Sequence, residues 1–473
     1  MKKLRLKIAE KDFEELQRLV LADMPREAGA FALAGLAKHD DYTDIIVRRP
    51  VPIPKGLFRV QHEFRLEMHT QAINGLVALC EANKLGAILC HSHPEDSPYS
   101  PSDDYGEYRV FSTLWKFIPS NAPTASLLFY PTGVRGRVWL PDSKAPIPIS
   151  EIVILGRHLQ RIQPNTPSLS LSQNIDGIFD RQVRAFGERG QALIAQTKVG
   201  IVGVGGTGSP SAEQLIRLGV EDLVLIDPDE FELSNLTRVY GTYASALRRH
   251  WWQLKRKTPL KVELVASNLR RINPQAKIKA VPKNVVLKEA ARHLLDRDVV
   301  FLCTDDHWGR SIVNQIAYQY FIPTINLGMH VAAKDRFISD AVGIVDVLRP
   351  DKPCLWCRQF LSSERINAES IPYRDKMTLQ QEGYVENIDT PTPAVVSITT
   401  TLAGIAVSLY LQLVTDFMGL KGDVSRLNYD VLASTVRRGT GTIPSGCVCR
   451  KIRGFGDLST LTTLSDLSFL KAG

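Results

Sequence analysis

Two histidines separated by one residue follow an apolar segment in the first third of the chain. The segment Gly86–Cys90 is typical of a strand, and it continues into His91-Ser-His93. Side chains at positions i and i+2 of an extended segment project to the same side, so both imidazoles can reach one metal ion. Further on, Asp103 offers a carboxylate. Two histidines and one carboxylate leave a fourth position for water, which is the arrangement of a catalytic zinc site.

Such a site needs a general base beside the metal. Zinc lowers the pKa of a bound water from about 15.7 toward about 7, and a carboxylate can then take its proton. Glu27 is the candidate, because it immediately precedes the apolar run Ala28–Gly35. A His-x-His pair on its own more often marks two ordinary histidines than a metal site. The prediction therefore depends on the base, the histidines and the carboxylate occurring together.

These residues occur in the order of a known pattern. Glu27, then His91-Ser-His93-Pro94, then Ser100-Pro-Ser-Asp103 resemble the JAB/JAMM (MPN-type) metalloprotease family, over roughly residues 1–155. The resemblance implies an α/β domain with a cytidine-deaminase-like sheet and zinc-dependent cleavage of peptide or isopeptide bonds. It also implies that Glu27 shuttles the proton, that Ser100 supports the developing oxyanion, and that zinc is held by His91, His93 and Asp103.

One spacing departs from that family. The gap between His93 and Ser100 is one residue shorter than usual. Ser102 is therefore an alternative to Ser100 as the hydroxyl that supports the oxyanion. Asp104 is likewise an alternative to Asp103 as the third ligand, whereas the assignment of the two histidines is unaffected.

A glycine-rich turn in the second half of the chain indicates a phosphate site. The strand Val199–Val204 contains the first of four glycines in this turn, which are Gly203, Gly205, Gly206 and Gly208. Glycines let the backbone approach a phosphate, and the N-terminus of the following helix favours negative charge. About 20 residues on, Asp227 can bond ribose hydroxyls. Alone, this pattern would indicate NAD or FAD, or a turn that binds no ligand.

The residues that follow argue against a dinucleotide. Asp229 follows Asp227 closely, Ser234-Asn235-Leu-Thr-Arg238 comes next, and Lys261 begins an amphipathic helix that ends in Ile-Asn-Pro. Asp305 ends the strand Val300–Thr304, and Arg181-Gln182 precedes the whole region. This ordered set resembles the ThiF/MoeB and ubiquitin-activating superfamily over about 270 residues. The resemblance implies a Rossmann-like, doubly wound domain that adenylates a carboxylate.

Adenylation accounts for this set of residues. A carboxylate attacks the α-phosphate of ATP and pyrophosphate leaves, so cations must neutralise the triphosphate, a role open to Arg238 and Lys261. Asp305 can hold Mg²⁺, Asp227 fixes the ribose, and Asn235 contacts the phosphate region. In this superfamily the arginine of the Arg-Gln pair reaches into the partner subunit's site, so Arg181 implies a homodimer.

One basic and aromatic run has no counterpart in that pattern. Residues 246–257, Ala-Leu-Arg-Arg-His-Trp-Trp-Gln-Leu-Lys-Arg-Lys, replace a short turn that relatives carry before the lysine. Arg256 and Lys257 are therefore rivals of Lys261, although Lys261 keeps the spacing to Ile-Asn-Pro. We interpret the run as a solvated face, with a docking patch as the alternative.

Four of the seven cysteines fall in two close pairs. These pairs are Cys354-Leu-Trp-Cys357 and Cys447-Val-Cys449, about 90 residues apart. Close pairs of this kind in a cytosolic protein predict a tetrahedral structural zinc site. ThiF/MoeB relatives carry such a site, with two residues rather than one inside the second pair. The alternative is two pairs of ordinary thiols.

A cysteine is missing where ubiquitin-activating enzymes form a thioester. The corresponding region, Arg358–Pro393, contains none. Cys303 lies on a core strand, where a buried thiol is usually inert. We therefore expect a partner's nucleophile to attack the adenylate directly, with an oxyester on Thr390 or Thr392 as the alternative.

Alternating strands and helices must position these residues. The segment Gln163–Ser172 has the composition of a linker, so we predict a JAB/JAMM domain over 1–160, a linker over 161–172 and a ThiF/MoeB-type domain over 173–473. In the first domain we expect helices at Lys11–Leu21 and Phe64–Ala82, and strands at Ala28–Gly35, Asp44–Val51 and Gly86–Cys90. In the second we expect helices at Gly208–Leu218 and Lys261–Ile272, and strands at Val199–Val204, Leu223–Asp227, Asp298–Thr304 and Thr324–Leu327. This alternation predicts an α/β fold with a doubly wound, mostly parallel sheet.

The composition excludes some classes of protein. The 473 residues carry a net charge of +8, which is no nucleic-acid signature by itself. The N-terminus lacks the apolar core of a signal peptide. The longest apolar stretch, Thr401–Val414, is short and polar for a membrane span and favours a buried helix. We expect a cytoplasmic protein that binds neither nucleic acid nor membrane.

The two halves together predict one function. We expect the second domain to adenylate the C-terminal glycine of a ubiquitin-like protein, using ATP and Mg²⁺. We expect the zinc domain to process that protein or release it from targets, within a bacterial conjugation pathway that has a conjugating-enzyme-like partner. The alternatives are activation of a sulfur-carrier protein through a thiocarboxylate and a nucleotide-binding scaffold without turnover.

Overall fold

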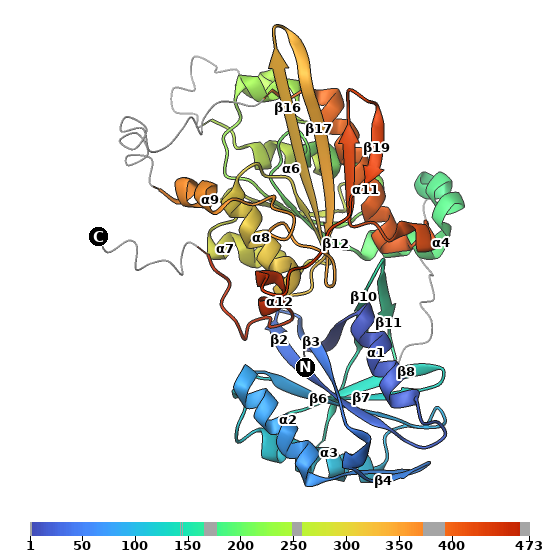
Figure 1. The fold of residues 1–473 in the computed structure, drawn as a ribbon. Helices are drawn as coiled ribbons and strands as arrows, with labels where there is room; N and C mark the ends of the chain where they lie inside the picture. The colour runs from blue at the N-terminus through green and yellow to red at the C-terminus, as the bar shows by residue number, and fades with distance from the viewer. Residues whose placement is uncertain are drawn as a thin grey trace. The chain divides into compact units, whose positions relative to one another are not determined.

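A computed structural model describes residues 2–141, 143, 145–164, 177–247, 258–371 and 393–463. The chain divides into two compact units (Figure 1). Unit 1 takes in residues 1–170 together with 319–321 and 451–460. Unit 2 takes in residues 171–318, 322–450 and 461–473. Most of the expected linker, residues 165–172, lies outside the described residues.

Unit 1 is built on a mixed sheet in the order β11-β10-β1-β3-β2-β6-β7-β8-β9. The strands are β1 (Lys3–Ala9), β2 (Gly29–Lys38), β3 (Tyr42–Pro52), β6 (Gly86–Ser92), β7 (Thr124–Tyr130), β8 (Gly133–Trp139), β9 (Ile147–Pro148), β10 (Glu151–Leu155) and β11 (Leu159–Ile162). The interior strand β6 pairs antiparallel with β2 and parallel with β7. It lies deep in the sheet and is buried along its whole length.

Helices cover both faces of this sheet, because side chains along each strand alternate between two cores. One core joins Ile88 and Leu127 to the helix α1 (Glu10–Leu21). The other joins Leu89 to the helices α2 (Thr70–Asn83) and α3 (Pro101–Leu114). After β6 the chain continues into α3, on the face of the sheet that α2 and α3 cover.

The helix expected over Phe64–Ala82 begins later than predicted. Residues Arg65–Met68 form β5, which pairs antiparallel with β4 (Phe58–His62) in a separate hairpin. The reason lies in the order Arg-Leu-Glu-Met, which alternates polar and apolar residues as a strand does. The helix α2 starts only at Thr70.

Unit 2 contains a sheet in the order β14-β13-β12-β15-β16-β17-β18-β19. The strands are β12 (Lys198–Val202), β13 (Asp222–Ile226), β14 (Lys277–Val281), β15 (Val299–Leu302), β16 (Thr324–Lys334), β17 (Phe337–Leu348), β18 (Arg426–Asp430) and β19 (Thr435–Arg438). The first five in this order, β14 to β16, are parallel, whereas β16 to β19 are antiparallel. The α/β prediction is confirmed, but the antiparallel half of this sheet was not foreseen.

The order of the parallel strands creates a point where the chain reverses direction across the sheet. From β12 it moves outward to β13 and β14, and then returns to the other side of β12 to form β15 and β16. Ligands of such sheets bind at the carboxyl ends of the strands at this switch point. The helices of the unit are α4 (Asp180–Gln196), α5 (Gly208–Arg217), α6 (Lys261–Ile272), α7 (Lys288–Ala291), α8 (His307–Gln319), α9 (Ser363–Ser370), α11 (Val396–Thr415) and α12 (Val448–Ile452).

The apolar stretch Thr401–Val414 lies within α11, which is longer than that stretch. By length and composition α11 could cross a membrane, and 61% of its most apolar window is buried inside the protein. It packs against α4, α5, β16 and β17, and Leu402, Tyr410 and Leu413 belong to the buried core.

Candidate functional sites

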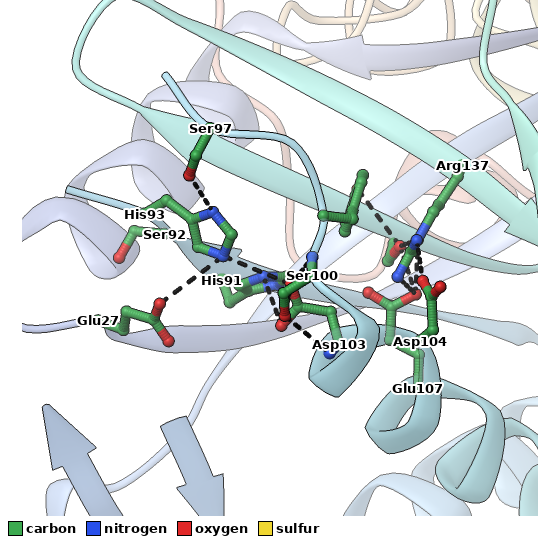
Figure 2. Close-up of polar contacts among 12 residues, drawn as sticks. Glu27, His91, Ser92, His93, Ser97, Ser100, Asp103, Asp104, Glu107 and Arg137 are labelled. Carbon is green, nitrogen blue, oxygen red and sulfur yellow. Dashed lines mark hydrogen bonds and ion pairs between the residues drawn. The ribbon is translucent and has the colours of Figure 1, made fainter. Parts of the chain in front are cut away.

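The expected metal-binding residues of unit 1 converge at one point (Figure 2). The strand β6 carries His91, and His93 follows directly after the strand, while Asp103 lies in the first turn of α3. Nε2 of His91 is 3.5 Å from Oδ1 of Asp103, and Nε2 of His93 is 3.5 Å from Oδ2 of the same carboxylate. One ligand atom from each side chain lies within 4.8 Å of the others.

This arrangement fits a divalent metal such as zinc. Ligands at about 2.0–2.2 Å from a tetrahedral ion lie about 3.3–3.5 Å apart, and the distance from each histidine to the carboxylate of Asp103 agrees with this spacing. Nε2 of His91 is buried and has no hydrogen-bond partner among the described residues. Burial also lowers the pKa of His91 to about 4, so the ring is neutral at pH 7, as a metal ligand must be.

The expected base lies beside these ligands. Oε1 of Glu27 is 3.7 Å from Nε2 of His93, and the carboxylate is buried. Burial raises the pKa of Glu27 to about 7, near the value that suits a group passing protons at neutral pH. The position is fixed by backbone bonds, because Glu27 N donates to His62 O (3.0 Å) and Ala28 N donates to Ser92 Oγ (3.1 Å).

The two alternatives at the start of α3 differ in their surroundings. Asp103 faces the histidines, whereas Asp104 is paired with Arg137. Ser100 is the N-cap of α3: its Oγ accepts from Asp103 N (3.1 Å) and donates to Asp103 Oδ2 (2.8 Å). The Ser100 hydroxyl therefore adjoins the ligand carboxylate, while Ser102 is exposed on the first turn of the helix.

These residues line a cleft of about 960 Å³. The hairpin β4–β5 lines it with Phe64, Leu66 and Met68, and α3 contributes Tyr105 and Val110. Charged residues such as Arg65, Glu67 and Arg109 also line it, so the cleft offers both apolar and polar contacts. An extended peptide segment could lie along it and present a bond to the histidine cluster.

The glycine turn of unit 2 has the close backbone approach that the sequence predicts. Gly203 follows β12 with φ of +85°, a conformation that favours glycine. A β-carbon on Gly208 would lie only 1.9 Å from Gly203 O, so no other residue fits there. Gly208 begins α5, and the turn thus brings backbone N–H groups and a helix N-terminus to the switch point of the sheet.

Carboxylates and a lysine gather at the end of β13. Asp227 is buried, and its carboxylate accepts from Val204 N (2.8 Å) and Asp229 N (2.9 Å). Burial raises the pKa of Asp227. Nζ of Lys261, at the start of α6, is 2.7 Å from Oδ2 of Asp229. The bond from Val204 N thus ties Asp227 to the glycine turn, and the ion pair with Asp229 holds Lys261 near Asp227.

Two further expected residues come from the turn after β13. The aliphatic stem of Arg238 lies against Gly206, and its Nη1 donates to Ser234 O (2.9 Å). Asn235 is buried, and its Oδ1 accepts from Glu232 N (3.1 Å). Arg238 therefore lies over the glycine turn, whereas the carbonyl oxygen of the Asn235 side chain closes its own turn.

Three polar residues follow β15: Asp305, which the sequence analysis expected at the nucleotide site, and Asp306 and Arg310, which it did not. Asp305 is exposed, and it follows the strand that pairs with β12. Asp306 caps α8 by accepting from Gly309 N. The buried Arg310 donates to Asn326 Oδ1 (2.6 Å) and Leu327 O (3.1 Å), which fixes α8 to β16. The sequence signal for Arg310 was an arginine on the helix that directly follows Asp305, the carboxylate expected to hold Mg²⁺.

Arg181 is not part of this cluster in its own chain. It is exposed in the first turn of α4, next to Gln182, whose Nε2 donates to Arg217 O (3.2 Å). The rivals of Lys261, Arg256 and Lys257, lie outside the described residues. So do Thr390 and Thr392.

The four paired cysteines meet at one point. Sγ of Cys354 is 3.6 Å from Sγ of both Cys357 and Cys447, and Sγ of Cys357 is 3.3 Å from Cys447 and 3.7 Å from Cys449. Four thiolates at about 2.3 Å from a tetrahedral zinc lie about 3.8 Å apart. The donor set and its spacing fit a structural zinc ion.

Comparison with known proteins gives a family for the second half of the chain. The model of the ThiF family matches residues 179–441, more than half of the 473 residues. Ubiquitin-like modifier-activating enzyme 5 of Aedes aegypti is 30% identical over 203 residues, which cover 40% of this chain and 45% of that protein. The adenylyltransferase and sulfurtransferase UBA4 of Meyerozyma guilliermondii is 30% identical over 136 residues, or 29% of this chain and 30% of that protein. The chain thus spans less than half the length of these relatives.

Solved structures are more distantly similar. The crystal structure of E. coli MccB with ATP has a TM-score of 0.43 and 16% sequence identity, covering 60% of this chain and 76% of that one. MccB with AMPCPP and a MccA peptide has a TM-score of 0.45 and 15% identity, covering 59% and 75%.

Proposed function

Because the chain belongs to the ThiF family, we propose that it uses ATP and Mg²⁺ to adenylate the C-terminal glycine of a ubiquitin-like protein. The observation that carries this proposal is that Asp227 and Arg238 contact the glycine turn, while Lys261 pairs with Asp229 close by. Asp305 follows the carboxyl end of the neighbouring strand β15, which pairs with β12. These groups suit a nucleotide with a charged triphosphate.

Each residue has a definite part in this reaction. The substrate carboxylate forms a bond to the α-phosphorus of ATP, and the bond to the departing pyrophosphate breaks. Arg238 and Lys261 stabilise the negative charge that develops on the phosphates, and Asp227 accepts from the ribose hydroxyls. Asp305 would hold Mg²⁺, which supplies further neutralisation of the triphosphate.

Exchange of pyrophosphate into ATP tests this proposal. We expect exchange that depends on a ubiquitin-like protein with a free C-terminal glycine, and a decrease of about 10²–10³-fold in Arg238→Ala and Asp305→Ala, since each removes a group that stabilises the transition state. Arg271→Ala is a matched control, because Arg271 lies in the last turn of α6, at the opposite end from Lys261. Unchanged exchange in Asp305→Ala would refute the assignment of the Mg²⁺ ligand.

We also propose a second activity, hydrolysis of a peptide or isopeptide bond after a C-terminal glycine by unit 1. It is supported by the spacing of His91, His93 and Asp103, and by the unpartnered Nε2 of His91. Zinc held there would supply a water of lowered pKa. The oxygen of that water would bond to the carbonyl carbon while Glu27 takes its proton, and Glu27 would pass the proton to the amine as the C–N bond breaks. The Ser100 hydroxyl, which donates to Asp103 Oδ2 in this structure, would turn to donate toward the developing oxyanion. This is the chemistry that the resemblance to the JAB/JAMM family implies.

The fate of the acyl group follows from the cysteines. We infer that Cys354, Cys357, Cys447 and Cys449 hold structural zinc, and thiolates committed to a metal are poor acyl acceptors. Burial raises the pKa of Cys303 to about 12, which leaves this thiol protonated at neutral pH. We therefore propose direct attack on the adenylate by a conjugating-enzyme-like partner. An oxyester on Thr390 or Thr392 is the alternative, and an adduct that survives thiol but not hydroxide would identify it.

Two other functions make different predictions. A sulfur-carrier pathway would yield a thiocarboxylate rather than a protein-linked product. A scaffold without turnover would bind ATP and release no pyrophosphate. The proposed assignment to a bacterial conjugation pathway in the cytoplasm can be checked from the genes adjacent to this one.

A further inference from the structure

A second polar cluster adjoins the proposed metal site, and its centre is Arg137 on β8 (Figure 2). This guanidinium is buried. Its Nε donates to Glu107 Oε2 (3.0 Å), and its Nη1 donates to Asp104 Oδ1. The carboxylate of Glu107 also accepts from Ser126 Oγ (2.9 Å) and Trp139 Nε1 (2.6 Å). Strands β7 and β8 thereby hold α3 through a buried ion pair.

A third contact extends the cluster toward the histidines. Cζ of Arg137 lies 3.6 Å from the centre of the Tyr99 ring, a stacked cation–π arrangement. The Tyr99 ring meets the His91 ring nearly edge-on, with ring centres 5.9 Å apart. Tyr99 immediately precedes Ser100, the N-cap of α3.

The three contacts of Arg137 enclose the functional part of the segment. Tyr99 lies just before Ser100, Asp104 lies just after Asp103, and Glu107 is one helical turn further. We propose that Arg137 is a positioning residue, which fixes residues 99–107 so that Asp103 meets both histidines in the geometry that a metal requires. This inference rests on the proposed hydrolase function, because it assumes that Asp103 is a ligand.

The chemistry of the side chain explains why arginine stands at this position. A guanidinium is planar, donates in several directions within its plane and stacks on a ring with its face. Lysine can donate to one or two of these carboxylates, but its ammonium is not planar and cannot stack in the same way. Arg137→Lys should therefore retain part of the function, whereas Arg137→Met should retain none of the polar contacts.

Zinc binding tests the role without depending on catalysis. The full chain, with its cysteine cluster loaded, is titrated with Zn²⁺ in competition with a chromophoric chelator. We expect wild type to bind one equivalent beyond the cysteine cluster, and His91→Ala to lose it. Arg137→Met should weaken this second equivalent by about 10–100-fold, as loss of groups that orient ligands does, and Arg137→Lys should fall between. With Co²⁺ at that site, its d–d absorption should also change in Arg137→Met.

A matched control separates this effect from general destabilisation. Arg161 on β11 is also paired with a carboxylate, Glu151, but β11 lies at the opposite edge of the sheet from β8 and β9. Arg161→Met should bind zinc as wild type does. Wild-type zinc affinity in a folded Arg137→Met protein would overturn the inference and leave the metal site intact. If Arg137→Met does not fold, wild-type affinity in Arg137→Lys overturns it. Unchanged stoichiometry in His91→Ala would instead remove the metal site itself, and with it the role of Arg137.

Discussion

Burial distinguishes Glu27 from most carboxylates in unit 1. Its Oε1 lies 3.7 Å from Nε2 of His93, beside the proposed metal ligands. Burial raises the pKa of Glu27 to about 7, so the group can both accept and release a proton near neutral pH. The side chain does not belong to the set of atoms that would bind the metal, which separates its role from that of the ligands.

Glu27→Gln should therefore keep zinc and lose hydrolysis. The amide preserves the shape of the side chain but cannot take a proton, so we expect cleavage of a fusion after the C-terminal glycine of a ubiquitin-like protein to slow by about 10²–10⁴-fold. Zinc content, measured on the same preparation, should equal that of wild type. Cleavage at the wild-type rate would exclude Glu27 as the base.

The sequence identified the residues expected to carry chemistry more readily than the residues that support them. His91, His93 and Asp103 follow from strand alternation and from the ligand types that zinc prefers, and the structure places them together. Arg137 and Glu107 were missed, because a charged residue on a strand or helix is usually solvated. Only the tertiary structure shows that both are buried and paired.

At the scale of elements, the parallel strands of unit 2 were the most predictable part. Continuous apolar runs and intervening helices indicate a parallel sheet, and α6 spans the expected range, Lys261–Ile272. The antiparallel strands β17 to β19 were not predicted. The hairpin of β16 and β17 turns at Asp335-Arg336, which lacks the glycine that usually signals such a turn, and β17 pairs with β18 from a distant part of the chain. The hairpin β4–β5 was missed because its alternation is short.

One element of unit 1 comes from the far end of the chain. Residues 451–460 were assigned to the second domain from the sequence, yet they cluster with unit 1. Gly456 forms a parallel bridge with Leu36, and Phe455 packs against the core that contains α2 and α3. Arg453 Nη2 donates to Asp12 Oδ2 (2.7 Å). The segment thus packs against strands β2 and β3 of unit 1.

Substituting Gly35 tests this contribution. A β-carbon on Gly35 would lie 2.2 Å from Gly454 O and 2.4 Å from Phe455 O, so Gly35→Ala must displace the segment. We expect a loss of about 1–3 kcal/mol in the free energy of unfolding and faster hydrogen exchange in β2. Gly75→Ala is the control, because nothing lies within 4 Å of its β-carbon position, and alanine in a helix should be neutral or stabilising. Equal protection of β2 in both variants would show that the segment adds no stability.

At the scale of the whole molecule, we propose that one chain joins two kinds of chemistry and that two copies of it work together, with Arg181 as the residue shared between them. Arg181 is exposed in α4 and lies outside its own nucleotide cluster. If the chain is a homodimer and Arg181 acts in the partner's site, mixing Arg181→Ala with Asp305→Ala protomers should restore up to about a quarter of wild-type exchange, since random pairing leaves one intact site in half of the dimers. Absence of rescue in mixtures shown to exchange subunits would place Arg181 in its own site.

We propose above that this chain transfers the adenylyl group of ATP, rather than a phosphoryl group, to the terminal carboxylate of a ubiquitin-like protein. The most direct measurement is to identify the nucleotide formed when the chain is incubated with ATP, Mg²⁺ and a ubiquitin-like protein that ends in glycine, with an acceptor nucleophile present. The arrangement of Arg238, Lys261 and Asp305 predicts AMP and pyrophosphate in equal amounts, formed only when the terminal carboxylate is free. Production of ADP and phosphate, or of no nucleotide product with any such protein, would contradict the account.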